Sequence, residues 1–204
     1  MTQIYVPGAC SVAIKCKDGV VLGNDTRITW GYSVSNKNTR KVFKITENIG
    51  ITAYGLVGDF QNLVQTFKAQ ANLYVLREGS PITCHAMAKM ISNYLFQRKM
   101  NPLYVNVTIA GIDKDEPQVW ATDAAGSLMP DDYAVGGTGA TMAVGILEAE
   151  YKPDLTVGQG EKLIEKCIHA AIKRDASIGN GIDILTITKE GTKEKSIRLT
   201  DLGE

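Results

Sequence analysis

The sequence has no excess of charge of either sign and no long apolar run. Its 204 residues carry 22 lysines and arginines against 22 aspartates and glutamates, so the formal net charge is zero. A balanced charge gives no case for binding nucleic acid or an anionic membrane surface. No uninterrupted apolar stretch approaches the ~20 residues that a membrane-spanning helix needs, and residues 1–8 lack the basic start and apolar centre of a secretion signal. We therefore expect a cytoplasmic protein with no membrane or nucleic-acid partner.

Cysteine and histidine are scarce and scattered. The chain has four cysteines and two histidines, at Cys10, Cys16, Cys84, Cys167, His85 and His169. No CxxC spacing occurs, which argues against a zinc site and favours buried free thiols. The acidic run 113–117 lacks the later glycine and the closing glutamate of a calcium loop, so it predicts a solvated hairpin turn. We expect no metal and no cofactor.

The glycine-rich run 136–139 raises the possibility of a phosphate loop. It lacks the lysine of that loop and the spacing of a dinucleotide fingerprint, which argues against nucleotide binding. A tight turn from a strand into a helix, which aims the Thr138 hydroxyl, explains the run better.

Hydrophobic periodicity predicts one domain in which strands and helices alternate. A core of adequate size is available, because 44% of the residues are hydrophobic and no linker-like stretch divides the chain. Strands are expected at 10–16, 20–26, 41–46, 49–57, 105–112, 118–122, 133–136, 182–188 and 196–199, and helices at 59–78, 82–98, 138–151 and 156–174, the last capped by Thr156. The apolar stripe of the first helix is expected to include Phe60, Leu63, Val64, Phe67, Ala71, Leu73 and Leu76. This order fits an α/β (α+β) fold, a four-layer αββα sandwich with helices outside two antiparallel sheets.

A set of charged residues follows the first predicted hairpin. Asp25 and Arg27 end its second strand and Lys41 begins the next. A lysine held beside carboxylates can lower the pKa of a neighbouring hydroxyl or thiol, or can itself lose its proton. The alternative is an ordinary solvated set of surface charges.

Several motifs in one order resemble the archaeal type of proteasome β subunit. The resemblance covers nearly the whole chain and rests on Gly8, Gly23-Asn24-Asp25-Thr26-Arg27, Asn36-Lys37-Asn38-Thr39-Arg40-Lys41-Val42-Phe43, Gly55-Leu56-Val57-Gly58-Asp59, Asp123-Ala124-Ala125-Gly126, Gly136-Gly137-Thr138-Gly139 and Lys173-Arg174-Asp175. The resemblance implies the αββα fold of N-terminal nucleophile hydrolases. It also implies a threonine nucleophile, freed by self-cleavage after a glycine.

The resemblance assigns roles to individual positions. The threonine position is Ala9, which has no hydroxyl and can neither attack a substrate nor cut the bond after Gly8. Residues 1–8 should therefore stay attached as a leader to a single domain, 9–204. The implied catalytic set is Ala9, Asp25, Lys41, Thr138 and Asp175, with Arg27 as a structural partner, and the implied substrate-binding set is Thr29, Ala53, Tyr54 and Gly55.

The chain departs from the family pattern near this site. Ile178 stands where a serine is usual, and Tyr54 replaces a small residue on the strand that pairs with substrate, so we expect a lost hydroxyl and a crowded channel. Cys10 and Ser11 are poor substitutes for the nucleophile. Strand alternation turns Cys10 away from Lys41 and places Ser11 roughly 7 Å further along the chain.

These features predict a β-type subunit of the 20S proteasome core particle, a threonine-type endopeptidase complex, with its own nucleophile missing. The resemblance implies α subunits and other β subunits as partners in stacked seven-membered rings, and unfolded polypeptides as substrates. Two alternatives stay open. One is an active threonine-type endopeptidase subunit captured as a nucleophile-to-alanine variant, and the other is a free-standing amidohydrolase of the same fold.

Overall fold

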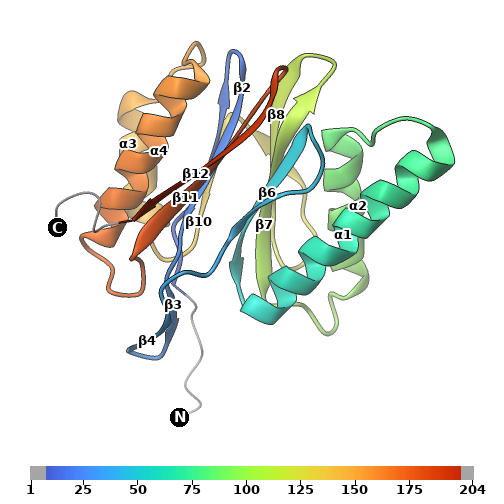
Figure 1. The fold of residues 1–204 in the computed structure, drawn as a ribbon. Helices are drawn as coiled ribbons and strands as arrows, with labels where there is room; N and C mark the ends of the chain where they lie inside the picture. Colours follow the sequence, from blue (N-terminus) through green and yellow to red (C-terminus); the bar gives the residue numbers. More distant parts are fainter. Residues whose placement is uncertain (1–7, 199–204) are drawn as a thin grey trace.

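Two antiparallel sheets lie face to face, and a pair of helices covers each outer side (Figure 1). The computed structural model describes residues 8–198. The strands are β1 (Ser11–Cys16), β2 (Gly19–Asp25), β3 (Ile28–Trp30), β4 (Ser33–Asn36), β5 (Val42–Lys44), β6 (Ile49–Gly55), β7 (Val105–Asp113), β8 (Glu116–Thr122), β9 (Met129–Asp131), β10 (Tyr133–Gly136), β11 (Gly181–Thr188) and β12 (Gly191–Arg198). The helices are α1 (Val57–Glu78), α2 (Cys84–Gln97), α3 (Ala140–Glu150) and α4 (Val157–Ile172). The predicted αββα sandwich is confirmed.

The first sheet has the order β10-β1-β2-β11-β12. The hairpin of β1 and β2 turns at residues 17–18, and its register places Val12 opposite Gly23. Both strands have a paired strand on either side, and both are almost fully buried because helices cover one face and the second sheet covers the other. The start of β1 and the end of β2 therefore lie next to each other, in the interior of the sheet.

The faces of β1 and β2 divide the core. Val12 and Ile14 pack with residues of α3 and α4, whereas Ala13 and Leu22 pack between the two sheets. Thr156 caps α4 as predicted, since its side chain accepts a hydrogen bond from the Gln159 amide in a capping box.

The second sheet has the order β5-β6-β7-β8-β9 and is covered by α1 and α2 (Figure 1). In α1 the predicted stripe is correct from Phe60 to Ala71, but Leu73 and Leu76 are 37% and 83% exposed. A helix of 22 residues is about 33 Å long, whereas a seven-residue strand such as β6 spans only about 23 Å. The last turns of α1 therefore extend past the strand on which its first turns pack.

Four strands differ most from the prediction. The short strands β3, β4 and β9 were not expected, and β12 begins at Gly191 instead of residue 196. The strands β3, β4 and β9 have only three or four residues each, too few to show a clear alternation of apolar residues. The strand β12 lies at the edge of its sheet, where one side is open to solvent and the alternation is weak. Within residues 8–198, none of the helices combines the length and the apolar character needed to span a bilayer.

Candidate active site

Ala9 lies at the start of β1, enclosed by the turn that follows β10. It is 1% exposed, and its carbonyl accepts a hydrogen bond of 3.0 Å from the Gly139 amide. A Cβ built on Gly137 would lie 2.2 Å from the Ala9 carbonyl oxygen, and the φ of Gly137 is 87°. Both the close approach and the left-handed backbone require glycine at position 137. The glycine-rich turn therefore fixes the backbone at residue 9.

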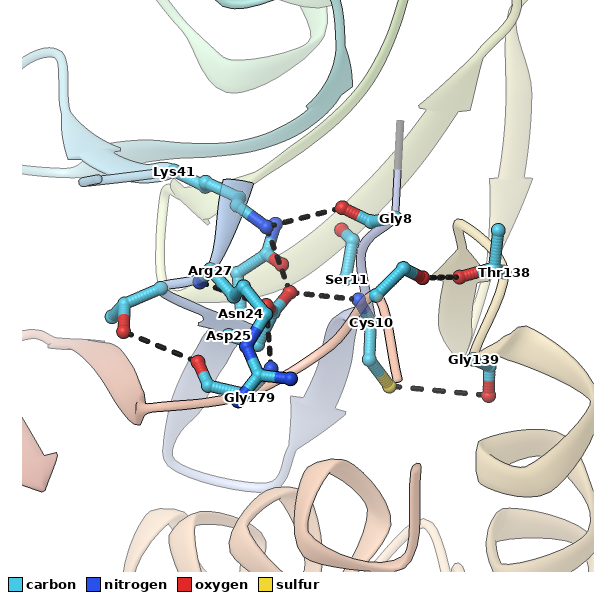
Figure 2. A network of polar contacts seen from close by, with 12 residues as sticks. Gly8, Cys10, Ser11, Asn24, Asp25, Arg27, Lys41, Thr138, Gly139 and Gly179 are labelled. Carbon is cyan, nitrogen blue, oxygen red and sulfur yellow. Dashed lines mark hydrogen bonds and ion pairs between the residues drawn. The ribbon is translucent and has the colours of Figure 1, made fainter. Parts of the chain in front are cut away.

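The carboxylate of Asp25 is the centre of a buried polar network (Figure 2). One oxygen accepts from Lys41 Nζ at 2.9 Å and from the Cys10 amide at 3.0 Å. The other accepts from the Arg27 amide at 3.0 Å and from the Gly179 amide at 3.2 Å. Each oxygen of this buried carboxylate therefore accepts two hydrogen bonds, which fixes its position.

Lys41 brings a buried ammonium to the same place, just before β5. Its side chain is 1% exposed, and Nζ also donates to the Gly8 carbonyl at 3.3 Å (Figure 2). Burial lowers the pKa of Lys41, and the Asp25 carboxylate opposes that shift. The lysine is thus held against the peptide group between Gly8 and Ala9, and the alternative of a solvated surface set is wrong for Asp25 and Lys41.

Arg27 lies on the outer side of this network. Its guanidinium donates to Asn180 Oδ1 at 2.9 Å and to the Ala176 carbonyl at 2.7 Å. Arg27 therefore ties the end of β2 to the loop between α4 and β11. This arrangement matches the structural role that the sequence suggested.

A second polar group, formed by Asp175, Ser177 and Thr138, lies on the other side of Gly8. The Ser177 hydroxyl donates to Asp175 Oδ1 at 2.6 Å and lies 3.2 Å from the Thr138 hydroxyl. A Cβ built on Gly8 would lie 2.1 Å from Ser177 Oγ, so this hydroxyl touches the residue before Ala9. Burial raises the pKa of Asp175, but the hydrogen bonds from Ser177 and Thr138 outweigh it, and the net shift is downward.

Sequence reasoning missed Ser177. It had assigned the lost hydroxyl to Ile178, which is fully buried and packs against the Gly139 backbone, with its Cδ1 2.6 Å from a Cβ built there. The preceding residue, Ser177, brings a hydroxyl close to Gly8. The Asp-x-Ser spacing from Asp175 was a usable signal, because an aspartate after a helix often bonds the residue two positions later.

Cys10 and Ser11 face opposite sides of β1. Cys10 packs with α3 and α4, and Sγ lies 4.0 Å from the Gly139 carbonyl (Figure 2). Burial, followed by the charge of Asp25, raises the pKa of the Cys10 thiol far above its ordinary value. Ser11 faces the second sheet and bonds Thr52 at 3.0 Å. Neither residue is placed as a nucleophile, and all four cysteines of the chain are buried free thiols.

The residues assigned to substrate binding lie on two strands, β3 and β6. Thr29 is buried on β3, while Ala53, Tyr54 and Gly55 end β6. The ladder between β5 and β6 has its last pair at Val42 and Thr52, followed by one bond from the Ala53 amide to the Lys41 carbonyl. In the described part of the chain no β5 residue pairs with Tyr54 or Gly55, so this stretch offers a strand edge of the kind that binds extended peptides.

Two groups of polar side chains thus lie close to Ala9. A buried lysine and carboxylate lie on one side of the peptide between Gly8 and Ala9, and a carboxylate with two hydroxyls lies on the other. Such groups can lower the pKa of a hydroxyl and orient an amine. The Ala9 methyl can take part in neither step.

Comparison with known proteins gives a consistent result. The family described as "Proteasome subunit" matches residues 6–187. The chain is 38% identical to "Proteasome subunit beta 2" of Pyrobaculum aerophilum over 94% of its own length and 95% of that protein. It is 41% identical to "Proteasome subunit beta 1" of Staphylothermus marinus, over 91% of this chain and 87% of that protein. It is 38% identical to "Proteasome subunit beta 1" of Nitrosopumilus maritimus, over 94% of this chain and 96% of that protein.

Proposed function

This chain belongs to the proteasome subunit family, and from that premise we propose that it is a β-type subunit of a 20S core particle. In this proposal it forms part of the inner rings, between outer rings of α subunits, and lines a cytoplasmic chamber that degrades unfolded polypeptides. The chain itself is catalytically silent because Ala9 stands at the position of the nucleophile. The observation that carries the proposal is the contact of Lys41 Nζ with both Asp25 and the Gly8 carbonyl, beside the Ala9 methyl.

With threonine at position 9, the supporting residues have definite tasks. The hydroxyl oxygen would attack the Gly8 carbonyl carbon, and the hydroxyl proton would pass to the nitrogen of residue 9 as the bond between that carbon and nitrogen breaks. Water would then hydrolyse the resulting ester, which frees the threonine hydroxyl and leaves a carboxylate on Gly8. Lys41 lies against the Gly8 carbonyl oxygen. During the attack this oxygen becomes negatively charged, and the positive charge of Lys41 would stabilise it. Asp25 keeps Lys41 in place, and Asp175 with Ser177 and Thr138 lies where the freed amine would form.

The second candidate is an active threonine-type endopeptidase subunit captured as a nucleophile-to-alanine variant. The intact surroundings of Ala9 favour this candidate, because Asp25, Lys41, Thr138 and Asp175 are all in contact with groups of the same site. The free-standing amidohydrolase has no such support and also needs the missing nucleophile.

Residues 1–8 should remain attached as a leader after assembly, since Ala9 cannot cut the bond that follows Gly8. Residues 1–7 lie outside the described part of the chain, so this expectation rests on the chemistry at Gly8 and Ala9. Intact mass spectrometry of the assembled protein should find the leader still present, apart from removal of the initiator methionine. A new N-terminus at residue 10 or 11 would show that Cys10 or Ser11 acts after all.

Ring assembly is the direct test of the subunit assignment. Large apolar side chains are exposed on the outer helices, among them Leu76 at 83% and Phe96 at 54%, and we expect neighbouring subunits to cover them. Sedimentation should show ordered rings only with α subunits or a companion β subunit. Leu76→Glu should reduce assembly, whereas Gln70→Glu, which adds the same charge at an exposed position of α1, should not. A monomer unchanged by added α rings would contradict the assignment.

A further inference from the structure

The ring of Tyr54 lies in the space between the two sheets. Thr52 and Gly50 lie on the same face of β6 as Tyr54, and this face is directed toward the first sheet. Thr52 bonds Ser11 on β1, and a Cβ built on Gly50 would touch Leu185 on β11. Tyr54 follows this alternation and meets Gly136 at the end of β10. A Cβ built on Gly136 would have three atoms of Tyr54 as its nearest neighbours, with Cε1 at 2.1 Å, Cζ at 2.6 Å and the hydroxyl oxygen at 2.8 Å.

Gly136 is required by space and not by its backbone conformation. It pairs with Ser11 in the ladder between β1 and β10, and its φ is not positive. Glycine within a strand weakens it unless something must approach closely. Here the phenol ring of Tyr54 makes that approach. Positions 54 and 136 are therefore matched in size, one large and one without a side chain.

The contact between Tyr54 and Gly136 leads directly to residue 9. The next residue, Gly137, touches the Ala9 carbonyl, and Gly139 donates its amide to that carbonyl at 3.0 Å. The Tyr54 phenol also interacts with the Gly137 backbone, where a hydrogen bond opposes the rise in phenol pKa caused by burial. The ring thus fills the space behind the turn that holds Ala9.

We infer that Tyr54 is a positioning residue, which holds the turn of Gly136, Gly137 and Gly139 against the backbone of residue 9. A small side chain at 54 would leave a gap behind this turn and let it move away from Ala9. The inference rests on the proposed function only in taking residue 9 as the position of the nucleophile. The packing itself can be tested on the chain as it is.

A double-mutant cycle tests the pairing. Gly136→Ala should destabilise the fold in the presence of Tyr54 and have much less effect when combined with Tyr54→Ala, because the alanine methyl then has room. Gly145→Ala on α3, where an added Cβ meets nothing within 4 Å, is the matched glycine control and should not couple to Tyr54. An equal effect of Gly136→Ala in both backgrounds would overturn the inference.

Hydrogen exchange tests the positioning. In Tyr54→Ala the amide of Gly139 should exchange about tenfold faster than in the parent, while amides of β7 keep their protection, as expected for local opening. Tyr54→Phe keeps the ring and should stay within about threefold of the parent. If Tyr54→Ala does not fold, Tyr54→Leu replaces it, with an intermediate increase expected. Unchanged exchange at Gly139 would refute the positioning role, and this readout does not depend on any activity of the chain.

Discussion

Ala9→Thr should make the chain cut itself after Gly8 and then hydrolyse short peptides. The added hydroxyl would lie beside Lys41, which already contacts the Gly8 carbonyl at 3.3 Å, and cleavage would release an amine near Asp175 and Ser177. Loss of the nucleophile from a cooperative site costs several orders of magnitude in rate, so its return should raise peptidase activity by at least about 10³. The measurements are intact mass, for loss of residues 1–8, and hydrolysis of fluorogenic peptides by assembled particles.

The matched control for this experiment is Ala9→Val. Valine has the shape of threonine without the hydroxyl, so it tests whether the enclosed position beside Gly137 and Gly139 accepts the larger side chain. The valine variant should assemble, keep its leader and remain inactive. A threonine variant that assembles but neither cleaves itself nor hydrolyses peptides would show that a hydroxyl at position 9 is not sufficient for activity.

Further substitutions near the site separate two hypotheses. In the first, several positions of the site have lost their catalytic residues. In the second, only position 9 has changed. If the expected lost hydroxyl at Ile178 and the crowding by Tyr54 also block activity, Ile178→Ser and Tyr54→Ala are needed along with threonine. Ser177 already brings a hydroxyl next to Gly8 and Asp175, and Tyr54 packs on Gly136, so we expect Ala9→Thr alone to be sufficient. Activity that appears only with the added substitutions would favour the hypothesis that several positions of the site have changed.

The fold could be predicted from the sequence wherever a segment buries one face. The β1 and β2 hairpin, both helix pairs and the Thr156 cap follow from apolar periodicity and capping chemistry. The strands β3 and β4 could not be predicted in this way. They form a separate two-stranded hairpin. β4 is exposed throughout, and the three residues of β3 begin with two buried neighbours, Ile28 and Thr29, so neither strand shows an alternating pattern.

The site could be predicted as a set of residues but not as a set of contacts. Asp25, Lys41 and Asp175 are far apart in the sequence, and the resemblance named them without saying which atoms meet. The bond from Lys41 to the Gly8 carbonyl depends on how the chain before β5 packs against the start of β1, and the placement of Ser177 against Gly8 depends on how the loop after α4 folds back. Such long-range packing leaves no local pattern in the sequence, although the Asp-x-Ser spacing gives a partial signal.

Asp25→Asn should cost the fold about 3–5 kcal/mol, because it removes one partner of a buried ion pair. An asparagine offers one acceptor oxygen where the carboxylate receives four donors, so amides such as those of Cys10 and Gly179 would also lose partners. Denaturation by urea should therefore show a lower midpoint with an unchanged slope. Asp132→Asn, which removes only the half-exposed contact to Lys15 at 3.5 Å, should cost less than about 1 kcal/mol.

The pH dependence of Asp25→Asn identifies Lys41 as the source of the loss. Burial already lowers the pKa of Lys41 in the folded state, and removal of the Asp25 carboxylate takes away the charge that opposes this shift. The unfolded chain then binds more protons than the folded one between the lowered pKa and the ordinary value of about 10.4, so stability rises with pH across that window. The variant should show this rise more steeply than the parent, and Lys41→Met in the same background should abolish it and recover part of the lost stability. A pH profile parallel to that of the parent would mean that the loss comes from the missing amide partners alone.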